Sequence, residues 1–128
     1  MGGIAGLVHF SGEPPPLAQL HQLSAGIAHR GNDDKGMHSD GIACMAHRRH
    51  ALRYGDQRGP LKSDETIIAV DGRFYAHSES NLLELWNENG VGMLERLNGV
   101  FAMAIWEKRK KTLYLLRGAV GARPLFWA

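Results

Sequence analysis

A thiol, an imidazole and a hydroxyl are the side chains of this sequence that could begin covalent or acid–base chemistry. Cys44 is the single cysteine, and a thiolate can attack an amide or ester carbon as a covalent catalyst. It lies inside the apolar run IACMA at 42–46, where a free cysteine usually packs as a small hydrophobic side chain. His9 and Ser11 lie close together near the N-terminus, but no acid–base arrangement can be identified around them. These residues alone therefore point to no covalent catalyst.

Length and composition indicate an ordinary globular domain. The chain has 128 residues, of which 44% are hydrophobic and 22% are charged, so we expect a single domain over 1–128. The net charge of +2 argues against a nucleic-acid partner, and the basic cluster EKRKK at 107–111 is interpreted as a solvated hairpin turn. One cysteine excludes an internal disulfide and fits a reducing compartment. With no apolar run long enough to span a membrane and no signal pattern, we expect a cytoplasmic protein without a membrane partner.

The elements that must position any site follow from apolar spacing and from turn residues. A prolyl breaker, EPPP at 13–16, precedes leucines and an isoleucine at helical spacing. Asp71-Gly72 is typical of a tight turn after a β-branched strand. The pattern predicts one α+β domain with antiparallel strands: strands at 3–10, 42–47 and 66–70, helices at 17–27, 81–89 (capped by Ser80, closed by Gly90) and 93–97, a hairpin of 100–106 with 112–116, a polar turn at 32–36 and a loop at 53–65.

Six segments, in this order, resemble the class II glutamine amidotransferase domain, and most closely the N-terminal domain of asparagine synthetase and its relatives. The most specific are the block LNGVFAMAIW and the ending R-x-x-x-G-x-R-P-L. The resemblance covers nearly the whole chain. The segments are GIAGLV at 3–8, HRG at 29–31, AHRR at 46–49, VDGRFY at 70–75, LERLNGVFAMAIW at 94–106 and RGAVGARPLFWA at 117–128.

The resemblance implies a four-layer α-β-β-α sandwich of antiparallel sheets, the N-terminal-nucleophile fold. In that family, removal of the initiator methionine exposes a cysteine whose thiol attacks the glutamine amide, and the free α-amino group serves as the base. The ammonia released then reaches a synthetase domain. ATP and magnesium belong to the synthetase domain, so no cofactor and no metal are expected on this chain.

Two positions of the implied active site depart from the family pattern. Gly2 stands where the family has its nucleophile, and glycine has no side chain to replace a thiol. Asp71-Gly72-Arg73 stands where the family has an Asn-Gly-Glu motif that donates hydrogen bonds to the oxyanion. A carboxylate at 71 would repel that charge, and losing one such donor typically costs about 3 kcal/mol. The resemblance therefore implies degenerate catalytic positions at Gly2, Asp71 and Gly72.

Of the family's glutamine-binding residues, only the arginine of the AHRR segment has a counterpart, either Arg48 or Arg49. The acidic segment that binds the substrate's α-amino group in the family cannot be placed after Gly90. An arginine at 48 or 49 could clamp a carboxylate, or it could serve only as a structural hydrogen-bond donor. Both interpretations stay open at this point.

The ending departs as well, since Arg117 is followed by Gly118 where relatives have an aspartate. Because relatives continue beyond this point with further strands and a ligase domain, we expect a sandwich truncated at its C-terminal side, with an exposed sheet edge.

The resemblance suggests a non-catalytic domain that serves as a structural or binding subunit. Its partner would be an asparagine-synthetase-like, ATP-dependent amide ligase of the β-lactam synthetase or lasso-peptide cyclase type, or a second copy of the chain. The alternatives are an amino-acid sensor and a residual glutamine amidohydrolase that uses the free N-terminal amine.

Overall fold

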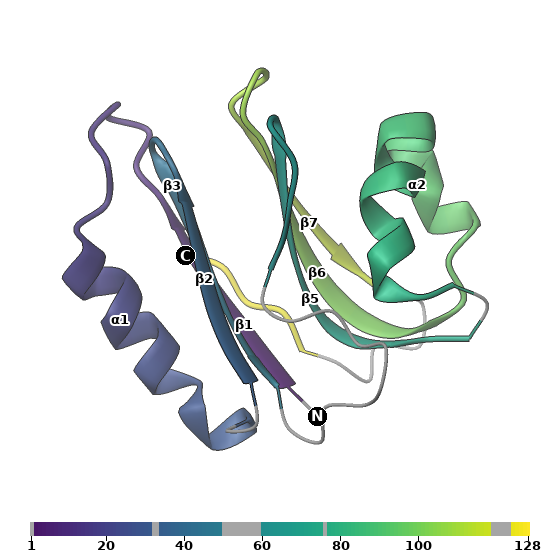
Figure 1. Cartoon of the computed structure of the whole chain (residues 1–128), viewed down its shortest axis with the longest axis horizontal. Coiled ribbons are helices and arrows are strands. Elements are labelled where there is room, and N and C mark those ends of the chain that lie inside the picture. The colour runs from purple at the N-terminus through teal and green to yellow at the C-terminus, as the bar shows by residue number, and fades with distance from the viewer. Residues whose placement is uncertain (1, 32–33, 50–59, 76, 119–123) are drawn as a thin grey trace.

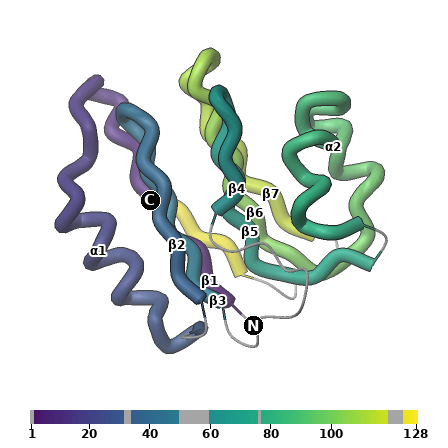
Figure 2. Tube along the Cα trace, in the orientation of Figure 1, coloured from purple at the N-terminus to yellow at the C-terminus, as the bar shows by residue number. Residues whose placement is uncertain are grey.

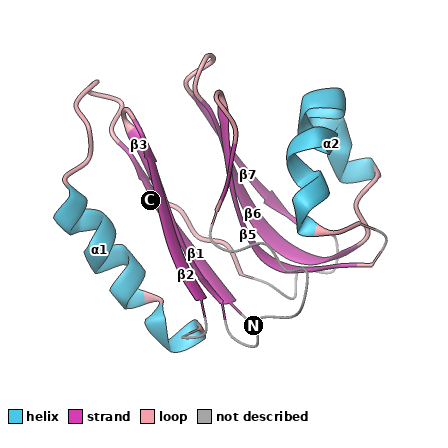
Figure 3. Ribbon diagram, in the orientation of Figure 1, coloured by secondary structure: helices cyan, strands magenta, loops and turns pink. Residues whose placement is uncertain are grey.

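Two antiparallel sheets face each other and each has a helix on its outer side (Figure 1). The computed structural model describes residues 2–31, 34–49, 60–75, 77–118 and 124–128. The layers follow the order helix, sheet, sheet, helix, and the helices lie outermost (Figure 3). The expected α+β sandwich of antiparallel sheets is therefore confirmed.

The first sheet, sheet A, has three strands in the order β1-β3-β2, all antiparallel. The N-terminal strand lies at one edge of this sheet, and its Gly2 is paired with Arg49. Helix α1 packs on the outer face and is followed by the short turn η1. The bounds are β1 Gly2–Val8, α1 Leu17–Gly26, η1 Ala28–Arg30, β2 Asp34–Asp40 and β3 Ala43–Arg49.

The second sheet, sheet B, has four antiparallel strands in the order β4-β5-β6-β7, with the short β4 at one edge (Figure 2). The strands β6 and β7 form the expected hairpin, and EKRKK supplies its turn. Helix α2 covers the outer face, and Gly90 ends it with φ of 56°, as expected. The bounds are β4 Leu61–Lys62, β5 Thr66–Phe74, η2 Glu79–Asn81, α2 Leu82–Asn89, η3 Gly90–Glu95, β6 Gly99–Glu107 and β7 Thr112–Arg117.

Alternation along β3 and β5 sorts their side chains into three apolar layers, because successive strand residues point to opposite faces. One layer lies between α1 and sheet A, the next between the two sheets, and the third between sheet B and α2. The buried members are, in that order: Leu20, Cys44 and Ala46; Ala43, Met45, Ile67, Ala69 and Trp106; and Leu61, Ile68, Val70, Leu82, Trp86, Met93, Phe101, Met103, Ile105 and Leu116.

Tryptophan occurs in three different surroundings. Trp106 is 1% exposed between the sheets, and its indole N–H has no hydrogen-bond partner among the described residues. Trp86 is buried beneath α2 and donates its indole N–H to Glu107 Oε1 at 2.8 Å. Trp127 is 83% exposed in the C-terminal segment, next to the equally exposed Phe126.

Two expectations from the sequence are wrong in detail. Asp71-Gly72 is not a turn, since β5 runs through both residues to Phe74 and pairs with β6 along its whole length. Glycine is needed at 72 because a Cβ there would lie 2.1 Å from the backbone oxygen of Val100. Ser80 does not cap α2: it lies in η2, and its hydroxyl bonds that of Ser78 instead.

The predicted polar turn at 32–36 and the predicted loop at 53–65 lie partly outside the described residues. Residues 34–36 of the first begin β2, and residues 61–62 of the second form β4. No helix in the part of the chain that the structure describes is both long and apolar enough to cross a bilayer.

Candidate functional site

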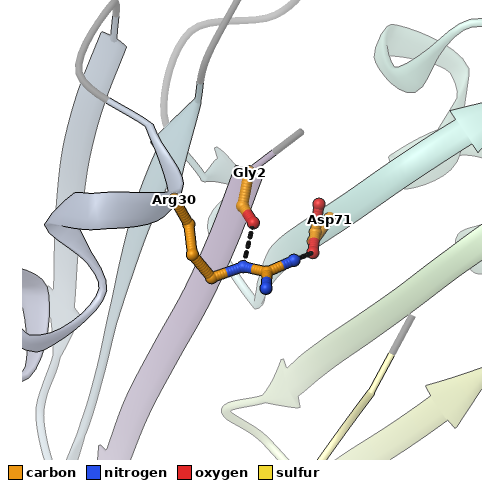
Figure 4. Close-up of polar contacts among 3 residues, drawn as sticks. All are labelled: Gly2, Arg30 and Asp71. Carbon is orange, nitrogen blue, oxygen red and sulfur yellow. Dashed lines mark hydrogen bonds and ion pairs between the residues drawn. The ribbon is translucent and has the colours of Figure 1, made fainter.

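The candidate site lies where the start of β1 meets the middle of β5, between the two sheets (Figure 4). Sheet A contributes Gly2, sheet B contributes Asp71, and Arg30 reaches between them from η1. The structure therefore brings together two of the three positions that the resemblance implies to be degenerate, and Gly72 follows directly on β5.

Arg30 connects the other two residues through separate nitrogens of its guanidinium. Its Nε donates to the backbone oxygen of Gly2 at 2.5 Å, and its Nη2 lies 3.2 Å from Asp71 Oδ2. The side chain of Asp71 is 7% exposed and that of Arg30 is 25% exposed. A carboxylate this buried needs a cation or several donors to offset its lost hydration, and Arg30 supplies the cation.

Position 2 has no room for a side chain. A Cβ built on Gly2 would lie 2.6 Å from the backbone oxygen of Arg48 and 3.3 Å from Asp71 Oδ1. The first separation is well below van der Waals contact, and the atom it meets belongs to the paired strand β3 rather than to a flexible side chain. Any residue other than glycine must therefore shift the β1–β3 pairing.

Arg48 and Arg49 lie on opposite faces of β3 and have different partners. The Arg48 Nε donates to Ser24 on α1, at 3.2 Å to its backbone oxygen and 3.1 Å to its hydroxyl. Arg49 forms an ion pair with Glu79 of η2, and both side chains are 10% exposed. The Arg48 contact fastens α1 to sheet A, whereas Arg49 links β3 to η2, which lies between β5 and β6 of sheet B in the chain.

Sequence reasoning left Arg30 without a role, although it belongs to the HRG segment that supports the resemblance. Its role depends on η1 folding back toward the start of β1, which no local pattern in the sequence predicts. The sequence offers one weak signal: Asp71 directly follows the apolar run at 66–70, and a carboxylate buried beside such a run requires a cationic partner.

The assembled groups can bind charge, but they hold no nucleophile. The described residues joined here, Gly2, Arg30 and Asp71, include no thiol and no hydroxyl. No group of three or more His, Cys, Asp or Glu that could hold a metal ion occurs within the described ranges. The geometry shows an ion pair that joins the two sheets through Arg30 and Asp71.

The only thiol of the chain lies elsewhere, in the layer between α1 and sheet A. Cys44 is 2% exposed and packs with Leu20 and Ala46, as the sequence predicts. Burial raises the pKa of its thiol above the usual 9.0, although a hydrogen bond with the backbone at Leu7 acts in the opposite direction. A buried, protonated thiol is a poor nucleophile.

We expect Cys44 to resist thiol reagents in the native protein and to make stability fall at high pH. Above pH 9.0 the unfolded chain loses the thiol proton that the folded chain keeps, so the free energy of unfolding should decrease as pH rises through the raised pKa. Urea unfolding at a series of pH values measures the effect. Cys44→Ala should remove this part of the dependence, and rapid labelling of native Cys44 would contradict its burial.

The comparisons with known proteins agree with this architecture. The glutamine amidotransferase domain family matches residues 1–81 and 73–128, two ranges that together span the chain. The chain belongs to the glutamine amidotransferase domain family.

Curated relatives of this amidotransferase domain include asparagine synthetases. "Asparagine synthetase [glutamine-hydrolyzing] 2" of Bacillus subtilis (strain 168) is 28% identical over 149 residues, which cover 99% of this chain and 20% of the relative. "Asparagine synthetase [glutamine-hydrolyzing] 1" of Lotus japonicus is 29% identical, with 82% of this chain and 21% of the relative covered. The chain therefore spans about a fifth of the length of these relatives.

Proposed function

We propose that this amidotransferase-like domain does not hydrolyse glutamine and serves as a structural or binding subunit of an asparagine-synthetase-like, ATP-dependent amide ligase. The observation that supports the first half is the lack of space at position 2. The resemblance assigns the family's nucleophile to this position, and here even a Cβ would meet the backbone oxygen of Arg48. Covalent hydrolysis requires a nucleophile at that point, and none is available.

The chemistry of Asp71 supports the same conclusion. The resemblance assigns an oxyanion donor to this position, whereas the carboxylate of Asp71 is an acceptor already paired with Arg30. A negative charge beside a developing oxyanion raises the barrier instead of lowering it. Nucleophile and oxyanion donor are thus both replaced by groups that cannot do the same work.

The proposal of a ligase partner rests on the relatives. Each of those named above is an asparagine synthetase of which this chain matches about a fifth. The β-lactam synthetase and lasso-peptide cyclase types of ligase fit best, because they use an amine already present in the substrate and need no ammonia. We further propose a cytoplasmic location, consistent with such a partner.

A glutaminase assay with the purified chain tests the catalytic half of this proposal. The expected result is no ammonia release from L-glutamine above the rate of a heat-denatured sample. The Bacillus subtilis relative, whose name states glutamine hydrolysis, is the positive control. Ammonia release that stops when the N-terminal amine is chemically blocked would favour a residual amidohydrolase instead.

Affinity isolation from the source cells tests the partner half, with a tag at the C-terminus and the N-terminus left free. A stoichiometric ATP-dependent ligase identified by mass spectrometry is the expected result. Recovery of the chain alone, as a monomer or as a homo-oligomer, would contradict the ligase partner.

A further inference from the structure

We propose that the carboxylate of Asp71 acts as an internal ligand of Arg30. It occupies the guanidinium and so closes the candidate site to carboxylates from solution. The contact crosses from Asp71 on β5 of sheet B to Arg30 in η1, which itself bonds to Gly2 on β1 of sheet A (Figure 4). This inference goes beyond the proposed function, because it concerns what the site binds and requires no partner protein.

The three arginines around the site differ in their acceptors. Arg48 donates to Ser24 on α1, and Arg49 pairs with Glu79 on η2. Arg30 forms its ion pair with Asp71. Removing the charge of Asp71 therefore releases Arg30 and leaves the contacts of Arg48 and Arg49 in place.

Asp71 engages one of the two terminal nitrogens of the Arg30 guanidinium. Only Nη2 reaches Asp71, at 3.2 Å and through one carboxylate oxygen, while Nε is committed to the Gly2 backbone. An arginine can offer two parallel N–H donors to a carboxylate, which gives a stronger and more directional pair. Among the residues that the structure describes, Nη1 has no acceptor. The site thus keeps donors for an external carboxylate once Asp71 no longer competes.

Access and anchoring favour the same assignment. The Arg30 side chain is 25% exposed, against 7% for Asp71, so solvent reaches the guanidinium more readily than the carboxylate. The bond from Nε to the Gly2 oxygen fixes the guanidinium and does not involve Asp71. A preorganised arginine loses less conformational entropy when it binds a ligand.

The test replaces Asp71 by asparagine, which keeps the shape and removes the charge. We expect Asp71→Asn to bind L-glutamate at least about ten-fold more tightly than the unaltered protein, since hydrogen bonds to charged groups contribute roughly 1.5–3 kcal/mol. Isothermal titration calorimetry with sodium glutamate, at constant ionic strength, measures the affinity. The double variant Arg30→Gln/Asp71→Asn should lose this increase in affinity for L-glutamate.

A matched control separates this site from general anion binding. Glu65→Gln releases Arg109 from an ion pair whose partners are 54% and 79% exposed, and should bind no glutamate in a saturable manner. Equal binding by the Glu65→Gln and Asp71→Asn variants would overturn the inference. So would a folded Asp71→Asn variant that binds no glutamate, and this result would leave the proposed function untouched.

A measurement on the unaltered chain keeps the inference falsifiable if Asp71→Asn does not fold. The Arg30 Nε–Hε resonance should be protected from solvent exchange by its bond to Gly2. A large excess of L-glutamate should leave its chemical shift unchanged. A saturable shift would mean that Asp71 does not close the site.

Discussion

Arg49→Met is expected to lower the free energy of unfolding by about 3 kcal/mol, the largest effect among our predictions. Removing one partner of a buried ion pair takes that favourable interaction away from a charge that stays desolvated, which typically costs about 3–5 kcal/mol. Both side chains of the Arg49–Glu79 pair are 10% exposed, so solvent replaces little of what the arginine supplied. Urea unfolding monitored by circular dichroism measures the loss.

The exposed ion pair of Arg109 with Glu65 provides the matched control for this prediction. Arg109→Met removes the same group from a pair whose side chains are 79% and 54% exposed. Exposed pairs contribute about 0–1 kcal/mol, so Arg109→Met should change stability by much less than Arg49→Met. Equal losses of unfolding free energy in the two variants would show that burial does not determine how much the Arg49–Glu79 pair contributes to stability.

Gly2→Ala is expected to cost about 1–3 kcal/mol, the usual range for overpacking a filled position. The new Cβ would lie 2.6 Å from the Arg48 backbone oxygen, and relief of this contact requires β1 to move away from β3. Gly26→Ala is the control, since a Cβ there meets nothing within 4 Å. Thermal and urea unfolding of both variants measure the difference. A Gly2→Ala variant as stable as Gly26→Ala would contradict the crowding.

The same contact predicts that Gly2→Cys does not create a glutaminase. The thiol would enter a position that must first be opened, beside a carboxylate that raises the pKa of a neighbouring thiol by repulsion. We therefore expect no ammonia release from Gly2→Cys. Turnover by this single variant would mean that the position retains the space and the electrostatics of a working site.

Much of the fold follows from the sequence because its core strands are short and apolar. The runs around Cys44 and at 66–70 become central strands, and the hairpin around EKRKK forms as predicted. β2 was not predicted, because DKGMHSD is polar and becomes a strand only by pairing with β3 along its full length. Likewise, pairing with β6 carries β5 through Asp71-Gly72, which in isolation favours a turn.

The candidate site was less predictable because its contacts join distant segments. Gly2 and Asp71 could be singled out only through the resemblance, and nothing local indicates that they meet. The sequence does not show whether Arg48 or Arg49 points toward the space between the sheets. This depends on the face of β3 that each occupies, which follows from the packing of Cys44 and Met45 on opposite faces. The pairing of Arg30 with Asp71 spans 41 residues and requires both sheets to be assembled.

The placement of the tryptophans gives the protein its own optical reporters. Trp106 lies in the apolar layer between the sheets, Trp86 lies beneath α2, and Trp127 is in contact with solvent. The blue-shifted part of the emission spectrum therefore belongs to the two buried rings, and Trp127 contributes the red-shifted part. A protein that covers the C-terminal segment would shift the Trp127 emission toward the blue, whereas separation of the sheets would shift that of Trp106 toward the red. One spectrum can thus distinguish docking at the surface from opening of the interior.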